Sequence, residues 1–234
     1  MPTGDHDDIK LEILDAQSDI VTTYYNDDGD VEDMGVDAPL HIHSTELEMD
    51  TGLIRFRWDM TYLCPWRADV NRRYSDGPVV TPGLYQARIT IGNQSSTQSF
   101  ELMVDPRVTE QGVNVTDITA QTELQGHISE LLSKSRKLEE ESNAEHMALH
   151  RQYRGQSADE RGADANADFD RVHATIRTLG TPNVIYPKAG LTGMISYLYN
   201  INSDADQIPG KDSIERFAEL TAEFDKVEAA YRDK

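Results

Sequence analysis

Residues 52–60 read G-L-I-R-F-R-W-D-M, residues 77–91 read G-P-V-V-T-P-G-L-Y-Q-A-R-I-T-I, and residues 104–107 close the segment with V-D-P-R. Ile54, Phe56 and Trp58 alternate with charged residues, which indicates a strand that buries one face. The Trp58 ring is expected to face the core, and Asp59 to accept backbone N–H groups in the following loop. The segment contains no catalytic motif and is typical of a module that accompanies an active protein.

The same two-residue period extends over residues 9–105. Its recurring positions are Ile9, Leu11 and Ile13; Ile20, Thr22 and Tyr24; Tyr85, Ala87, Ile89 and Ile91; and Phe100, Leu102 and Val104. Gly92-Asn93 favours a tight hairpin turn between the last two of these strands, and residues 26–40 and 63–82 have the composition of long loops. We therefore predict an immunoglobulin- or fibronectin-III-like β-sandwich over residues 1–106, with Trp58 and Tyr85 in its core.

After Arg107 the apolar period becomes helical. The repeating positions are Leu124, Ile128, Leu131 and Leu138; Phe169, Val172, Ile176 and Leu179; Leu191, Met194 or Ile195, and Leu198; and Ile214, Phe217, Leu220, Phe224, Val227 and Tyr231. Thr116 or Asp117 is the predicted cap of the first helix, and Ser213 or Asp212 that of the last. We predict an antiparallel helical bundle of about four helices over residues 107–234, with the domain junction at residues 107–116.

One part of the second half lacks this pattern. Gly155–Asp168 holds no apolar residue larger than alanine, so it buries little surface. We interpret this stretch as a mobile connection or a solvated helix end.

Charge and composition exclude several classes of protein. The chain of 234 residues carries 42 acidic and 22 basic residues, a net charge of −20, which disfavours nucleic-acid partners and anionic membranes. No window approaches the apolar length of a membrane span. Cys64 is the single cysteine, so an intrachain disulfide is impossible. Met1 is followed by P-T-G-D-H-D-D, which is not a signal peptide, so an extracellular address would have to lie on another part.

Trp66 is the candidate for a contact surface. It lies beside Arg67, Arg72 and Arg73 in a loop, and an aromatic ring among arginines suits contact with a partner, stacking on a sugar, or simple local packing.

The chain offers three weak metal candidates. Asp27, Asp28, Asp30 and Asp33 supply oxygens for calcium but miss the EF-hand spacing, so a solvated hairpin loop is the preferred interpretation. His41 and His43 share one face of an extended segment, whereas His146 and His150 lie one helical turn apart in the order E-H-x-x-x-H. Two histidines without a third ligand do not make a zinc site, so we predict no metal, cofactor or catalytic residue.

The strand motifs resemble the C-terminal region of bacterial Asp-box (BNR) or sortilin-like β-propeller proteins, which are usually labelled glycosyl hydrolases. That region carries a G-x-x-R-F-x-W-D-L-R-Y strand, then G-P-x-x-P-P-G-x-Y-x-x-R-L-T and D-P-R. The matching residues here include Phe56, Trp58, Asp59, Pro82, Gly83, Tyr85, Asp105 and Pro106. Met60-Thr61 and Thr81 depart from the pattern. The helices, with a turn at Ala205–Asp212, are similar as well, although less specifically.

The resemblance implies a function without chemistry of its own. The propeller that would carry a ligand or catalytic surface is absent from this chain, so none of its residues can be transferred. We therefore expect a non-catalytic accessory module of an extracellular or periplasmic propeller protein, which contacts that propeller in cis or in trans. The alternative is a free-standing module that binds carbohydrate or protein through the loops around Trp66 and Asp27–Asp33.

Overall fold

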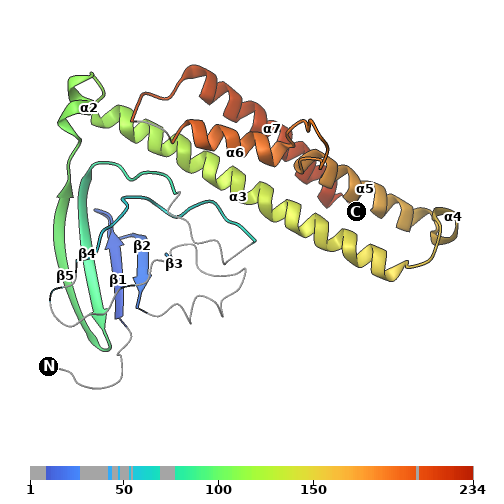
Figure 1. Ribbon diagram of the computed structural model, residues 1–234, viewed down its shortest axis with the longest axis horizontal. Coiled ribbons are helices and arrows are strands. Elements are labelled where there is room, and N and C mark those ends of the chain that lie inside the picture. The colour runs from blue at the N-terminus through green and yellow to red at the C-terminus, as the bar shows by residue number, and fades with distance from the viewer. Residues whose placement is uncertain are drawn as a thin grey trace. The chain divides into compact units, whose positions relative to one another are not determined.

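The computed structural model describes residues 9–26, 42–43, 47, 53, 55–68, 77–203 and 206–233. Strands come first and helices follow, so the chain belongs to the mixed α+β class (Figure 1). It divides into two compact units. The sheet unit comprises Met1–Pro65, Asp69–Glu123 and Ala205–Ile208, and the helical unit comprises Trp66–Ala68, Leu124–Asp204 and Pro209–Lys234. The predicted junction at residues 107–116 lies inside the sheet unit, and the division falls within a helix, after Glu123.

The strands of the sheet unit are β1 (Ile9–Leu14), β2 (Ile20–Tyr25), β3 (Ile42–His43), β4 (Gly83–Ile91) and β5 (Gln94–Leu102). They form a sheet in the order β3-β2-β1-β4-β5, in which β3 pairs in parallel with β2 and the other neighbours are antiparallel. The predicted hairpin is confirmed, because Gly92 and Asn93 join β4 to β5 and Gly92 has a φ of 53°. Within the described part of the chain these strands make one sheet, so the two-sheet sandwich stays a prediction.

Aromatic rings fill much of the core of the sheet unit. The Trp58 ring centroid lies 5.4 Å from that of Tyr85 and 6.0 Å from that of Phe100, while Phe56 meets Tyr24 edge-on at 4.5 Å. Trp58 and Phe56 come from an extended segment outside the named strands, which is bridged in antiparallel fashion to a second segment at Thr61 and Val79. Trp58 therefore packs against the core, as the alternation predicts.

Three polar or small residues of the same motifs have structural roles. Asp59 accepts a hydrogen bond from the Tyr24 hydroxyl at 3.5 Å. Pro82 directly precedes β4, which begins at Gly83. Gly77 fits where no side chain can, because a Cβ there would lie 1.6 Å from the Tyr62 carbonyl oxygen.

Two short sequences start the helices that follow β5. Asp105 caps α2 (Pro106–Glu110) by accepting the Arg107 N–H, and Pro106 occupies the first turn. The cap of α3 (Val115–Gln152) is Asn114, whose side chain accepts from the N–H groups of Thr116 and Asp117. The predicted caps Thr116 and Asp117 were therefore wrong by two or three residues. The Asp117 carboxylate nevertheless accepts a hydrogen bond from the Asn114 N–H.

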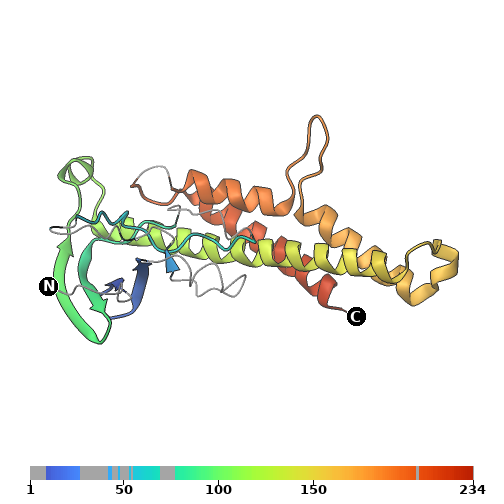
Figure 2. The same ribbon diagram turned by 60° about the horizontal axis from the view of Figure 1, so that its bottom comes forward.

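The helical unit combines α3 from Leu124 onward with α4 (Ala158–Arg161), α5 (Ala163–Leu179), α6 (Leu191–Ile201) and α7 (Lys211–Arg232). Helices α5, α6 and α7 lie along α3 in both views (Figures 1 and 2). Their apolar stripes share one core, which includes Ile128, Leu132, Val172, Ile195 and Phe224. The predicted periodic segments are thus confirmed as helices.

Two details of the helical unit differ from the predictions. Gly210 occupies the cap position of α7 with no side-chain hydrogen bond, so neither Asp212 nor Ser213 caps it. The weakly patterned stretch from Gly155 to Asp168 contains α4 and the first six residues of α5. Ser157 and Glu160 form a capping box at the start of α4, which explains a helix in a segment with little to bury.

Candidate functional site

The Trp66 side chain is buried and does not lie open on the surface. Its side chain is only 9% exposed, its backbone N–H donates to Ser133 Oγ at 2.9 Å, and its carbonyl accepts from Arg136 at 3.2 Å. The Lys137 ammonium lies 5.7 Å from the ring centroid. A ring covered in this way does not offer the open face on which a sugar stacks, so the structure favours the local-packing interpretation. Arg67, beside it, is half-buried.

The other candidates from the loops fall outside what is described. Asp27, Asp28, Asp30, Asp33, His41, Arg72 and Arg73 lie outside the described residues. His43 belongs to β3, and its side chain is likewise outside the description. The calcium candidate and the arginine surface therefore stay predictions.

The most exposed apolar side chains of the helical unit lie in the connection between α5 and α6. We call residues 181–190 the apolar loop; it projects from the helices in Figure 2. Ile185 is 89% exposed and Tyr186 is 93% exposed, and Val184 beside them is exposed as well. Large apolar side chains gathered at one exposed tip are typical of a contact surface.

The base of the apolar loop is pinned. The Gly190 N–H donates to Thr181 Oγ1 at 3.1 Å, and a Cβ at Gly190 would lie 2.3 Å from the carbonyl oxygens of Leu179 and Gly180. Only glycine permits this close approach of the two ends. Pro182 and Pro187 further restrict the backbone between them. The tip is therefore held out by a constrained base.

A groove of about 720 Å³ between α6 and α7 begins beside the apolar loop, at Ala189. Its apolar wall includes Met194, Tyr197 and Ile201 from α6, of which Tyr197 is 69% exposed. Its polar wall comes from α7, where Arg216 donates to Glu219 at 2.8 Å and to Met194 Sδ at 3.3 Å. The sequence pattern of α6 identified its buried stripe, with Met194 as an alternative member, but it did not point to Tyr197 or Ile201.

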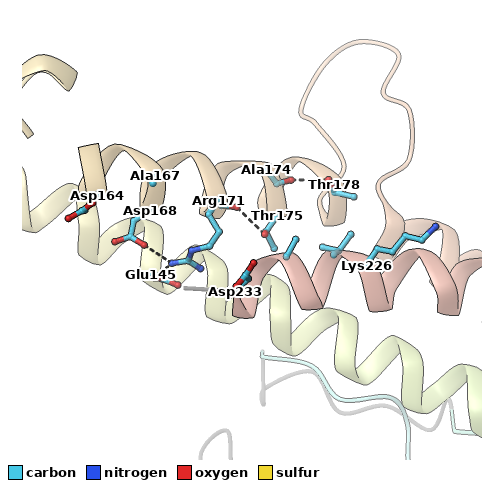
Figure 3. A pocket seen from close by; sticks show the side chains of 12 residues that line it. Glu145, Asp164, Ala167, Asp168, Arg171, Ala174, Thr175, Thr178, Lys226 and Asp233 are labelled. Carbon is cyan, nitrogen blue, oxygen red and sulfur yellow. Dashed lines mark hydrogen bonds and ion pairs between the residues drawn. The ribbon is translucent and has the colours of Figure 1, made fainter. Parts of the chain in front are cut away.

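A second groove, of about 850 Å³, lies among α3, α5 and α7, and Arg171 is its central side chain (Figure 3). The Arg171 guanidinium donates to Glu145 at 2.6 Å, to Asp168 at 3.1 Å and to the Tyr231 carbonyl at 2.8 Å. The Tyr231 hydroxyl donates to the other Glu145 oxygen at 2.5 Å. Burial and the Glu145 carboxylate raise the pKa of Tyr231, which keeps this hydroxyl protonated as a donor.

These bonds form a clamp between three helices. Glu145 comes from α3, Arg171 and Asp168 from α5, and Tyr231 from α7, so the network ties three helices together. The guanidinium also lies over the Tyr231 ring at 4.9 Å. Because Arg171 already pairs with two carboxylates and a carbonyl, its charge is committed to the fold.

Three of the seven histidines come together between α3 and α5: His146 and His150 lie on α3, and His173 lies on α5. His146 Nε2 lies 2.6 Å from His173 Nε2 and 3.0 Å from His150 Nε2. We call these residues the histidine cluster. Burial and the neighbouring imidazoles lower the pKa of His146. Phe169 supports the cluster, with its ring centroid 5.2 Å from that of His150.

The sequence pointed to two members of the cluster but not to the third. His146 and His150 are one turn apart, whereas His173 is separated from them by the whole α3–α5 connection. Its spacing of four residues from Phe169 is the one local signal, because it places both on the same side of α5. Whether that side meets His146 depends on how α5 packs.

No family model matches the chain, and neither a curated protein nor a solved structure matches it. The resemblance to propeller-protein tails therefore stays a prediction from the strand motifs. Within the described part of the chain, no helix has both the length and the apolar character to cross a membrane.

Proposed function

We propose that this chain is a non-catalytic accessory module that docks a β-propeller, in cis or in trans, in an extracellular or periplasmic protein. The observation that carries the proposal is the pinned apolar loop, whose tip residues Ile185 and Tyr186 are almost fully exposed. An exposed tip on a constrained base suits docking, because little conformational freedom is lost when a partner binds. The propeller as partner rests on the strand motifs at Gly52–Asp59 and Gly77–Arg107.

The groove between α6 and α7 extends this surface. Met194, Tyr197 and Ile201 offer apolar contact, while Asp212, Glu215 and Glu219 from α7 line the same groove. We infer a partner segment with apolar side chains for the wall and basic side chains for the carboxylates, since complementary charge directs encounter and orientation.

We also infer that the sheet unit is an immunoglobulin-like sandwich and the helical unit an antiparallel bundle. Two contacts support the sandwich. The Tyr85 hydroxyl donates to the carbonyl of Thr81, four residues upstream, at 2.6 Å, which is the kind of bond made by the tyrosine corner of such folds. The Thr61–Val79 bridge supplies pairing beyond the named strands. The apolar core shared by α3, α5, α6 and α7 supports the bundle.

The proposal is tested by comparing three tagged proteins in a capture experiment from the source cell, with cross-linking and mass spectrometry. They are the wild type, an I185S/Y186S variant, and an M103S control that removes an exposed apolar side chain from the sheet unit. We expect the wild type and the control to recover a propeller protein and the loop variant to lose at least about tenfold of it, because an exposed aromatic anchor typically contributes 1–2 kcal/mol or more.

The outcomes separate the parts of the proposal. If no propeller protein is recovered by the wild type, the proposed function is wrong. If all three proteins recover it equally, the docking surface lies elsewhere. The alternative is that a second copy of the chain binds the apolar loop. Analytical ultracentrifugation of the purified proteins tests it: the wild type would then sediment as a dimer and the loop variant as a monomer.

A further inference from the structure

The histidine cluster has a geometry that hydrogen bonding alone does not satisfy. One ring nitrogen of each histidine lies within 4.8 Å of those of the other two, and His146 Nε2 lies 2.6 Å from His173 Nε2 and 3.0 Å from His150 Nε2. A neutral imidazole nitrogen has either one proton or one lone pair. His146 Nε2 therefore cannot donate to one neighbour while it accepts from the other. One of its two short contacts is left without a proper hydrogen bond in any combination of tautomers.

A cation that accepts three lone pairs resolves this arrangement. Imidazole nitrogen is a common ligand of Zn²⁺, bound at 2.0–2.1 Å, and nitrogens around one tetrahedral zinc ion lie about 3.3–3.4 Å apart. The two short distances of 2.6 Å and 3.0 Å reach that separation if the rings open by less than about 1 Å. His150 and His173 both lie near the Phe169 ring, whose bulk limits how far they can turn away.

We propose that His146, His150 and His173 form a divalent transition-metal site, with Zn²⁺ as the fitting ion and a fourth coordination position open to water. Three histidines with an open position are a recurrent zinc ligand set. The site does not depend on the proposed docking function, because it uses other residues of the helical unit and a different ligand.

The position of the site gives the ion a structural consequence. It joins α3 to α5 beside the stretch Gly155–Asp168, which includes α4 and the start of α5 and contains no apolar residue larger than alanine. That stretch offers little apolar surface to bury, so an ion bound to both helices would hold their neighbouring ends together. Metal bound only by the folded protein raises the melting temperature of the helical unit.

The test uses full-length protein treated with a chelator and then dialysed free of it. Zn²⁺ is titrated against the protein by calorimetry with a competing chelator, and Co²⁺ is added in parallel to record its visible absorption. We expect the protein to bind one equivalent of Zn²⁺ and its melting temperature to rise. Bound Co²⁺ should show the intense visible absorption bands that are typical of four-coordinate cobalt. Removing one ligand in H173A should weaken binding by more than about 100-fold, since even the outer partners of metal ligands are worth 10–100-fold.

Matched variants keep the test decisive. H150A should lose binding as H173A does. H127A should bind Zn²⁺ as the wild type does, because His127 lies on the same helix α3 but stacks on Phe217 with ring centroids 6.2 Å apart. Unchanged circular dichroism of each variant confirms folding. The site is refuted if the wild type binds no Zn²⁺ at micromolar concentration, or if H173A and H127A bind it equally well.

Discussion

Each unit of this protein contains a partly buried ion pair, and the two pairs differ in what brings their members together. In the sheet unit, Glu12 of β1 lies directly opposite Arg88 of β4 in the strand register, and the two side chains meet at 2.7 Å. In the helical unit, Arg171 of α5 meets Glu145 of α3 at 2.6 Å. The first pair follows from the register of two hydrogen-bonded strands, whereas the second depends on how two helices pack against each other. Substitutions therefore probe different levels of structure in the two units.

The largest effect is expected in the shared core of the helices. F224A removes a ring that is almost fully buried among α3, α5, α6 and α7 and should destabilise the helical unit by about 3–5 kcal/mol. I214A is the matched control on the same helix, because the sequence pattern assigns Ile214 to the same stripe but the structure leaves it half-exposed. Its cost should stay below about 1 kcal/mol. Chemical denaturation followed by circular dichroism at 222 nm measures both, and equal losses would contradict the packing.

The next largest effect concerns the clamp. R171M keeps the bulk of the side chain but leaves Glu145 partly buried without its cation, so we expect a loss of about 2–4 kcal/mol. R177M, an exposed arginine on the same helix, should change stability by less than about 0.5 kcal/mol. The same denaturation measurement applies. If the two variants were equally stable, the network around Arg171 would be incidental to the fold.

The ion pair of the sheet unit should have a smaller, pH-dependent effect. Burial alone would raise the pKa of Glu12, but hydrogen bonds from Arg88 and Lys10 outweigh it and hold this pKa below the ordinary value of 4.5. Ionised Glu12 therefore stabilises the folded state fully above about pH 4.5, and this contribution is lost as the pH falls towards the lowered folded-state pKa. E12Q should cost about 1–2 kcal/mol at pH 7 and less in acid.

The stability of the sheet unit in E12Q is measured in a Trp66→Phe background. This substitution leaves Trp58 as the one tryptophan, so its fluorescence reports on the sheet unit. The exposed strand residue Glu101 provides the control, E101Q. A stability difference between E12Q and its parent that stayed constant from pH 7 to pH 3 would show that the charge of Glu12 does not contribute.

The smallest effect is expected at the tyrosine contact. Y85F retains the ring that packs on Trp58 and removes the hydroxyl, with its hydrogen bonds to the Thr81 carbonyl and the Tyr62 hydroxyl, so the sheet unit should lose about 1 kcal/mol. Y186F, at the exposed tip of the apolar loop, is the control and should be neutral. Fluorescence of Trp58 in urea measures the difference. A neutral Y85F would remove the main contact that supports an immunoglobulin-like corner.

Much of the fold follows from local patterns. The period-two positions of β1, β4 and β5 and the helical periods of α3, α5, α6 and α7 correspond to observed elements, and Gly92-Asn93 forms the predicted turn. Errors concentrate at element ends, where Asn114 caps α3 in place of Thr116 or Asp117. A cap is chosen by whichever side chain reaches the free N–H groups, and several neighbouring residues were chemically suitable.

The candidate sites were less predictable, for a physical reason. Residue order and periodicity are sufficient to assign most of the strands and the longer helices. They do not specify how one helix is shifted or rotated against another. The packing of the helices brings His173 to His146 and Arg171 to Glu145. The packing of a loop against α3 likewise buries the ring of Trp66. Such contacts are selected by the close packing of the whole interior, in which many side chains must fit at once, so they became visible only in three dimensions.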